Sequence, residues 1–260
     1  MAGRGLWQGL KLVGCAVWLR RGVPRDKEPV VLIACGSFSP VTLMHLRLLE
    51  DARDTLHAQG HRHVIGGYLS PTHDKYGKKT LALGHHRLNM TALAVEDSEW
   101  LNVDVWENAQ SGWTPTALVL DRFERALQAV ALTDEHGDPH PKPIKVMLTC
   151  GADLLDSFET IKEDGSPLWQ PAHQDIIARN GIVCLERQGT DIDEVIARQD
   201  VLARNRANIV VFPPAVTNSI SSTTVRRQLA QGRSVRYLIP RPVEDYIYRH
   251  QLHRLPNWQA

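Results

Sequence analysis

Short apolar runs alternate with longer amphipathic stretches along most of the chain. The apolar runs, rich in Val, Ile and Leu, predict six strands, at 30–35, 64–69, 101–105, 144–149, 181–185 and 209–212. Apolar residues that recur every three or four positions predict five helices, at 42–58, 85–96, 115–131, 223–231 and 242–250. This alternation is typical of an α/β fold with a doubly wound parallel sheet and helices on both faces. Because residues 30–35 are apolar without alternation, we expect a central strand that is buried on both sides.

The first 28 residues follow a different pattern, because basic side chains occur there without an acidic one until Asp26. At helical spacing Leu6, Leu10, Val13 and Val17 would share one face. This arrangement is similar to that of a mitochondrial presequence, although several glycines would weaken such a helix. A disordered basic arm is the alternative. We therefore divide the chain into a basic extension, residues 1–28, with a targeting role or no fixed structure, and a single domain, residues 29–260.

Composition and charge exclude several classes of protein. Hydrophobic residues make up 43% and charged residues 23% of the 260, as in ordinary globular proteins. A formal net charge of +1 gives no overall field that would favour nucleic acid. No apolar run reaches the about 18 residues that an integral membrane helix needs. The four cysteines form no C-x-x-C pair, which indicates a reduced intracellular protein without disulfides or structural zinc.

A loop of small residues follows the first predicted strand. Gly36, Ser37 and Phe38 lie where the carboxyl ends of parallel strands bind ligands, and the next helix offers unpaired N–H groups to an anion. Thr42 and His45, three residues apart on the first turn, face the same way, and an imidazole there can stabilise charge on a phosphate. In the alternative interpretation Thr42 only caps the helix and His45 is a surface residue. The preceding buried strand and glycine loop favour a phosphate site.

A second capped helix with an arginine in its first turns begins near Thr223. Ser221 or Ser222 can serve as its N-cap, and the guanidinium of Arg226 could bind phosphate oxygens in a bidentate manner. A solvated surface helix explains the same stretch equally well.

The loop after the second predicted strand is basic. Lys75, Lys78 and Lys79 lie in it, but the glycine spacing of a Walker loop is missing. Near two phosphate-binding helix ends these lysines would neutralise a triphosphate, and elsewhere they would be a solvated charge run. We assign His85 and His86, at the start of the next helix, a structural role.

The motif G-S-F-S-P-V-T-L-M-H, residues 36–45, resembles the first signature of the H-x-G-H nucleotidyltransferase superfamily. More narrowly, it resembles the eukaryotic nicotinamide-mononucleotide adenylyltransferases, which usually have Asn or Asp where this chain has Ser39. The second signature of that family, Ile-Ser-x-Thr-x-x-Arg, is matched by Ile220, Ser221, Thr223 and Arg226. The resemblance spans about residues 30–252 and implies a Rossmann-like fold.

The resemblance implies adenylyl transfer from ATP, with Mg²⁺, to nicotinamide mononucleotide and also to nicotinate mononucleotide. The products would be NAD or deamido-NAD and pyrophosphate. It assigns catalysis to His45, Lys79 and Arg226. It assigns ATP and NAD contacts to Gly36, Ser37, Phe38, Thr42, His45, Lys78, Lys79, Gly151, Asp153, Asn218, Ser221, Ser222, Thr223, Thr224, Val225 and Arg226. Contacts to the mononucleotide fall to Ser37, Phe38, Trp113, Thr116, Leu168, Trp169 and Arg187.

The two tryptophans of this set would offer flat apolar faces to a nicotinamide ring, although tryptophans in loops are more often packing anchors. No protein ligand for a metal is predicted. A homo-oligomer is expected, and the compartment is expected to be mitochondrial or cytoplasmic. A nuclear location is less expected, because the basic insert of nuclear relatives is missing between residues 120 and 144. Two alternatives stay open: a cytidylyltransferase of the same superfamily, and a chaperone-like module that keeps a nucleotide site without turnover.

Overall fold

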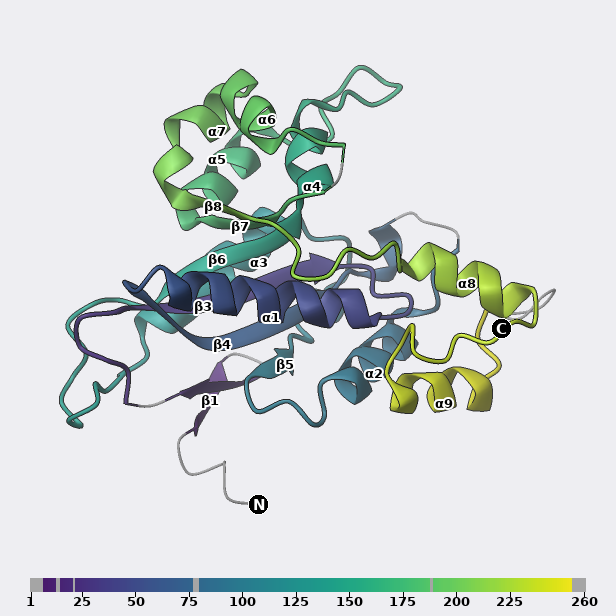
Figure 1. Ribbon diagram of the computed structural model, residues 1–260, viewed down its shortest axis with the longest axis horizontal. Helices are drawn as coiled ribbons and strands as arrows, with labels where there is room; N and C mark the ends of the chain where they lie inside the picture. Colours follow the sequence, from purple (N-terminus) through teal and green to yellow (C-terminus); the bar gives the residue numbers. More distant parts are fainter. Residues whose placement is uncertain (1–6, 13–14, 21, 77–79, 188, 254–260) are drawn as a thin grey trace.

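A six-stranded parallel sheet forms the centre of the molecule (Figure 1). The computed structural model describes backbone and side chains of residues 22–76, 80–187 and 189–253, and the backbone alone of residues 7–12 and 15–20. The strands are β3 (Glu28–Gly36), β4 (Arg62–Pro71), β5 (Leu101–Val103), β6 (Lys145–Gly151), β7 (Ile182–Leu185) and β8 (Ile209–Phe212). Their order in the sheet is β5-β4-β3-β6-β7-β8, and every neighbouring pair is parallel. All six predicted strands are therefore confirmed, with ends that differ by a few residues.

Helices cover both faces of this sheet, as the alternation of elements predicts. They are α1 (Leu43–Ala58), α2 (Gly84–Ala94), α3 (Thr116–Gln128), α4 (Ala152–Asp156), α5 (Pro171–Asn180), α6 (Ile192–Arg198), α7 (Asp200–Arg204), α8 (Ser222–Ala230) and α9 (Arg241–Arg249). The five predicted helices correspond to α1, α2, α3, α8 and α9. The sequence pattern did not predict α4, α5, α6 and α7, which gather beside β7 and β8 in Figure 1.

Strand β3 is the buried central strand, as its uniform apolar sequence predicts. Val30 and Leu32 pack with α1, α8 and α9 on one face, whereas Val31 and Ile33 pack with α3 and α5 on the other. All four side chains are fully buried. At about 25 cal/mol per Å² of apolar surface, these two layers supply the main stabilisation of the fold.

Two strands, β1 (Trp7–Leu12) and β2 (Cys15–Arg20), pair in antiparallel fashion before the main sheet. The helical pattern inferred for Leu6, Leu10, Val13 and Val17 is therefore wrong over the described part of this segment. Glycines disfavour a helix here, and Val17 and Trp18 are residue types that favour strands. The targeting role and the 29–260 domain boundary stay predictions.

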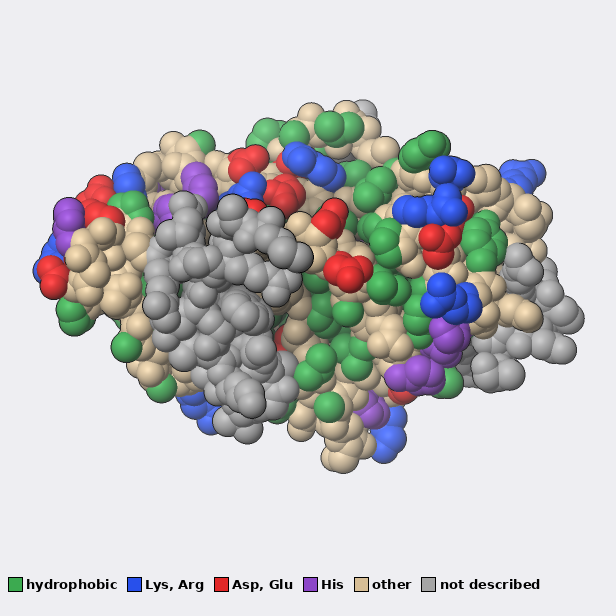
Figure 2. All heavy atoms as spheres, turned by 90° about the horizontal axis from the view of Figure 1, so that it is seen from below, with side chains coloured by type: hydrophobic (Ala, Val, Ile, Leu, Met, Phe, Trp, Pro, Cys, Tyr) green, Lys and Arg blue, Asp and Glu red, His purple; other side chains and the backbone are tan. Residues whose placement is uncertain are grey.

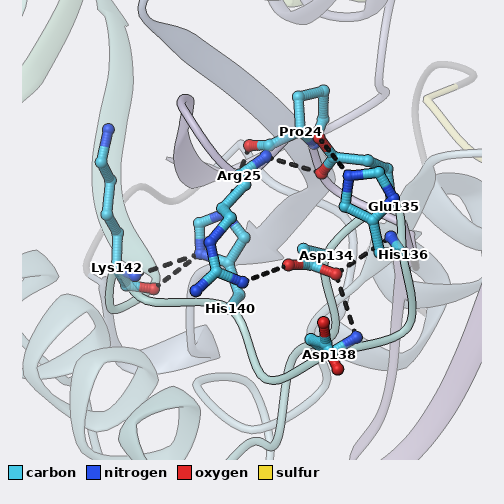
Figure 3. Close-up of polar contacts among 8 residues, drawn as sticks. All are labelled: Pro24, Arg25, Asp134, Glu135, His136, Asp138, His140 and Lys142. Carbon is cyan, nitrogen blue, oxygen red and sulfur yellow. Dashed lines mark hydrogen bonds and ion pairs between the residues drawn. The ribbon is translucent and has the colours of Figure 1, made fainter.

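At the amino ends of β3 and β6, a group of polar contacts fastens the loop at 133–143 to residues 24–26 (Figure 3). The carboxylate of Asp134 accepts hydrogen bonds from Arg25 Nη1 at 2.7 Å and from the backbone N–H groups of His136 and Asp138, each at 3.0 Å. Burial raises the pKa of Asp134, but these hydrogen bonds and the charge of Arg25 outweigh that effect and lower it. We call Arg25, Asp134, His136 and Asp138 the amino-edge cluster.

Candidate active site

The candidate site lies at the carboxyl edge of the sheet, where the strand order reverses between β3 and β6. Ligands of open α/β sheets bind at such a point, because the loops diverge there and leave a crevice. A cavity of about 690 Å³ opens at this edge. It brings together seven of the residues predicted from sequence: Gly36, Ser37, Trp113, Thr116, Asp153, Leu168 and Trp169.

His45 lies in the first turn of α1 with a defined tautomer. The backbone N–H of Thr42, the N-cap residue, donates to His45 Nδ1 at 2.9 Å, so the ring proton lies on Nε2. The Thr42 hydroxyl is also 2.9 Å from Nδ1, and the ring of Phe38 meets the imidazole edge-on at 5.2 Å. Burial, and then the charge of Arg187, lower the pKa of His45 to about 4. His45 is therefore a neutral N–H donor at physiological pH.

Helix α8 is held directly against the first signature loop. Ser222 Oγ donates to the carbonyl of Pro40 at 2.8 Å, and Arg226 Nη1 donates to the carbonyl of Ser39 at 2.8 Å. Ser221 is the N-cap, because its hydroxyl accepts the N–H of Thr224 at 3.1 Å. The two signatures, about 180 residues apart in sequence, thus form one structure with two helix N-termini.

Arg226 keeps part of its donor capacity for a ligand. Its second guanidinium nitrogen contacts Thr223 Oγ1 at 3.2 Å, and no acidic side chain of the described residues forms an ion pair with it. Burial lowers its pKa, although a guanidinium stays charged at neutral pH. A half-buried cation beside two helix N-termini is suited to bind phosphate oxygens.

Ser39 and Phe38 shape the loop between these helices. Ser39 is fully buried, and its hydroxyl accepts the backbone N–H of Ala82 at 2.9 Å, which ties the loop to the segment after the basic loop. Phe38 adopts a left-handed backbone with φ 44°, a conformation that is costly for a residue with a side chain. Burial of its ring, which also packs over Gly36, offsets that cost.

The aromatic end of the cavity has one exposed and one anchored tryptophan. Trp113 is 49% exposed and its ring lies 6.5 Å from that of Tyr76. Trp169 is fixed from two sides, since its indole N–H donates to Ser157 Oγ at 2.9 Å and its ring contacts Phe158 at 5.2 Å. Trp113 therefore presents a surface for a planar ligand, whereas Trp169 also supports the wall.

The remaining predicted contacts come from the ends of β6 and β7, from the segment after β8 and from the first turn of α8, where Val225 is fully buried. Asp153 and Arg187 form an exposed ion pair at 2.6 Å, and a Cβ atom at Gly151 would lie 3.6 Å from Arg187 Nε. Asn218 is exposed and accepts the N–H of Ile220 at 2.7 Å. Thr224 and Val225 lie in the first turn of α8. Lys78 and Lys79 lie outside the described residues.

Two residues of this edge were not predicted from the sequence. Glu107 lines the cavity and is 1% exposed, and Arg87 is fully buried and donates to the carbonyls of Ser37 at 3.1 Å and Ala82 at 2.9 Å. Glu107 lies in the segment D-V-W-E directly after β5, the third strand predicted from the sequence. Because ligands bind beyond the carboxyl ends of parallel strands, this position could have marked it as a site residue. No sequence signal marks Arg87.

The ring of His85 contacts that of His86, and the ring of His86 also contacts Tyr246 and His250. The three histidines form a group on the face of α2 and α9 (Figure 2). Over the described ranges, no group of three or more His, Cys, Asp or Glu side chains is arranged to hold a metal ion. Over the same ranges, no helix is long and apolar enough to cross a membrane.

Comparison with known proteins agrees with this geometry. Residues 33–228 match the cytidylyltransferase-like family. The chain is 38% identical to nicotinamide/nicotinic acid mononucleotide adenylyltransferase 1 of Bos taurus, over 88% of the chain and 90% of the relative. It is 42% identical to the corresponding enzyme of Arabidopsis thaliana, over 88% and 91%.

Among solved structures, the nicotinic acid mononucleotide adenylyltransferase of Plasmodium falciparum complexed with NaAD has the same fold. It matches with a TM-score of 0.59 at 19% identity, over 87% of this chain and 98% of that one. The fold class inferred from sequence is thus confirmed. Together, the family match, the relatives and the two joined signatures show that this chain belongs to the nicotinamide/nicotinic acid mononucleotide adenylyltransferase family.

Proposed function

We propose that this chain transfers the adenylyl group of ATP to nicotinamide mononucleotide or nicotinate mononucleotide, forming NAD or deamido-NAD and pyrophosphate. One observation carries the proposal: the N-termini of α1 and α8 converge on the loop at 36–40, with Arg226 bound to that loop and His45 beside it. Two positive helix ends and a cation at one point favour a polyphosphate over a neutral ligand.

The reaction needs positioning and charge stabilisation rather than a protein nucleophile. The phosphate of the mononucleotide attacks the α-phosphorus of ATP, and the bond to the β-phosphate oxygen breaks as pyrophosphate leaves. His45 donates its Nε2 proton in a hydrogen bond to a phosphate oxygen and remains neutral throughout, because its pKa of about 4 lies well below physiological pH. Arg226 and, from the sequence prediction, Lys79 neutralise the leaving group.

The cavity fits the second substrate. A volume of about 690 Å³ lies within the range of sites for molecules of nucleotide size. Trp113 offers a flat face for the pyridine ring, Thr116 and Leu168 border it, and the Asp153–Arg187 pair lies where ribose hydroxyls and phosphate would pass. Mg²⁺ would arrive with ATP as part of the substrate, held by phosphate oxygens and water. Asp153, which lines the cavity, is paired with Arg187, and Asp104 is paired with Arg122.

The test is a coupled assay in which purified protein receives MgATP and nicotinamide mononucleotide and NAD is followed through a dehydrogenase. We expect NAD formation by the natural chain and a large loss in Lys79→Ala and His45→Ala. CTP in place of ATP separates this proposal from the cytidylyltransferase alternative. ATP binding without formation of any dinucleotide would overturn the proposal and favour the chaperone-like module. Homo-oligomer formation and a mitochondrial or cytoplasmic location stay predictions.

A further inference from the structure

The cavity contains one charged side chain that differs from the others in its burial. Among the described residues, those that line the cavity and carry a formal charge are Lys75, Glu107, Asp153 and Lys162. Lys75, Asp153 and Lys162 are exposed, whereas Glu107 is 1% exposed. Water screens a charge at the rim strongly and a buried charge only weakly, so the charge of Glu107 is the least screened of the four.

Glu107 is hydrogen-bonded but not neutralised. Ser70 Oγ, at the end of β4, donates to Glu107 Oε2 at 2.8 Å. The neighbouring Asp104 is paired with Arg122 at 2.6 Å, but no lysine or arginine of the described residues forms an ion pair with Glu107. A buried carboxylate without a matching cation is costly unless a ligand supplies one.

The groups around Glu107 place it at the aromatic end of the cavity. Its charge acts on Tyr76, whose ring contacts Trp113, and on Cys35, which shares a hydrogen bond with Thr116. Cys35 itself is uncharged, because burial, and then Glu107 and Asp104, raise its thiol pKa well above the usual range. Trp113 and Thr116, the residues expected to hold the pyridine ring, line the same cavity as Glu107.

Glu107 changes its charge near neutral pH. Burial raises the pKa of Glu107 to about 7; the hydrogen bond from Ser70 lowers it, Asp104 raises it and the charge of Arg87 lowers it. The titratable groups near it are Asp104, three residues earlier in the same segment, and from other elements Arg87 of α2, Tyr76 and Cys35. Arg122 in turn is paired with Asp104.

We propose that Glu107 is a specificity-determining residue that favours the amide over the acid form of the pyridine mononucleotide. The inference rests on the proposed function. Both substrates carry a cationic pyridinium ring, but only the acid form adds a carboxylate. An ionised Glu107 attracts the ring of the amide form and repels the carboxylate of the acid form. A protonated Glu107 loses that repulsion and can donate a hydrogen bond to the acid.

The experiment measures kcat/KM for both mononucleotides between pH 6 and 8.5 and takes the ratio of acid to amide. Titrations of ATP, of the shared phosphate and of other protein groups affect both substrates and cancel to first order in the ratio. We expect the ratio to fall as pH rises in the natural chain. In Glu107→Gln we expect a ratio about tenfold higher at pH 8, equal to about 1.4 kcal/mol, and little dependence on pH.

Two further variants separate this role from a structural one. Ser70→Ala removes a hydrogen bond that lowers the pKa of Glu107, so the pH at which the ratio changes should move upward. Asp51→Asn removes a buried carboxylate that pairs with Arg47 on α1, outside the cavity, and should leave the ratio unchanged. A merely structural Glu107 would change both substrates together.

A ratio that is independent of pH in the natural chain overturns the inference, and so does a folded Glu107→Gln variant with the natural ratio. If neither mononucleotide is converted, the proposed function fails instead. The dissociation constants of both mononucleotides, measured by quenching of tryptophan fluorescence over the same pH range, then test the preference without turnover.

Discussion

Helix α1 joins the two edges of the sheet and carries a histidine near each end, in opposite tautomers. At the carboxyl edge, His45 Nδ1 accepts the N–H of Thr42, which leaves the proton on Nε2. At the amino edge, His57 Nε2 accepts the N–H of Val64 at 2.9 Å, which leaves the proton on Nδ1, and the ring stacks on His63. The first histidine is arranged around a neutral donor, and the second fills a gap in the hydrogen bonding of β4.

The buried carboxylates of the two edges, Asp134 and Glu107, also differ, because their surroundings shift their pKa values in opposite directions. Asp134 accepts hydrogen bonds from Arg25 and two backbone N–H groups (Figure 3), and its pKa is lowered. Glu107 has one hydroxyl and a nearby second carboxylate, and its pKa is raised to about 7. Asp134 therefore contributes stability above the pKa of an unfolded aspartate, whereas Glu107 costs stability as pH rises towards its folded pKa. The carboxylate of Asp134 is thus matched by its own neighbours, whereas Glu107 has no ion-pair partner among the described residues and is left for a ligand to match.

The largest expected effect is on turnover at the carboxyl edge. We expect His45→Ala to lower kcat about 100-fold or more, because one preorganised donor to developing charge is removed. This loss corresponds to about 2.7 kcal/mol. The measurements are kcat for NAD formation at saturating substrates and, as a check on folding, the melting temperature of the variant.

His57→Ala is the matched control, from the same helix. It leaves the buried N–H of Val64 without its acceptor, so the free energy of unfolding should fall by about 1–3 kcal/mol while kcat stays near the natural value. A loss of kcat below about threefold in His45→Ala would contradict the role of His45, since that is less than 1 kcal/mol.

The next largest effect separates the two tryptophans of the cavity. In Trp113→Leu we expect about a tenfold higher KM for the mononucleotide, because stacking of one base on an aromatic ring is worth about 1–3 kcal/mol. The melting temperature should hardly change, since half of the Trp113 side chain is exposed. Trp169→Leu should lower the melting temperature as well, through loss of the hydrogen bond to Ser157 and the packing on Phe158. Equal losses of stability in both variants would contradict this division.

The hydrogen bond between Ser39 and Ala82 is expected to stabilise the loops of the carboxyl edge. Ser39→Ala leaves the buried N–H of Ala82 without its acceptor, which should cost about 1–3 kcal/mol of unfolding free energy. Urea unfolding measures the loss, and hydrogen exchange at the Ala82 amide locates it. Unchanged exchange at that amide would show that the hydroxyl does not hold this segment. Arg87, which donates to the carbonyl of Ala82, remains in the variant and limits the effect on kcat.

Periodicity predicted the strands and long helices because their apolar residues face one continuous core. Helix α4 has five residues and cannot show a period, and α5, with the sequence PAHQDIIARN, carries few apolar residues. For residues 7–12 and 15–20 the pattern predicted a helix where the structure has two strands, since a short amphipathic pattern fits a helix and a strand about equally well.

The residue pattern by itself indicated the phosphate site where one segment carries the chemistry, and the family resemblance added the cavity residues on other segments. The loop at 36–45 and the N-terminus of α8 each hold their donors within a few residues. The charge state of Glu107 depends on Asp104 of its own segment and also on Ser70 and Arg87, which lie on two other stretches of chain. The tautomer of His45 depends on a backbone N–H that spacing alone does not orient. Both properties needed the fold.

The smallest expected effect is on stability at the amino edge, and its pH dependence has a definite sign. Asp134→Asn keeps an oxygen acceptor for the N–H groups of His136 and Asp138 but removes the charge that pairs with Arg25. We expect the melting temperature to fall by a few degrees at pH 7 with kcat unchanged. Because the pKa of Asp134 is lowered on folding, the natural chain's advantage is complete above the unfolded value of about 3.9 and disappears as pH falls through the folded value. Melting curves of both proteins from pH 7 down to about pH 3 should therefore converge. A gap that stays constant over this range would mean that the charge of Asp134 does not hold the loop at 133–143.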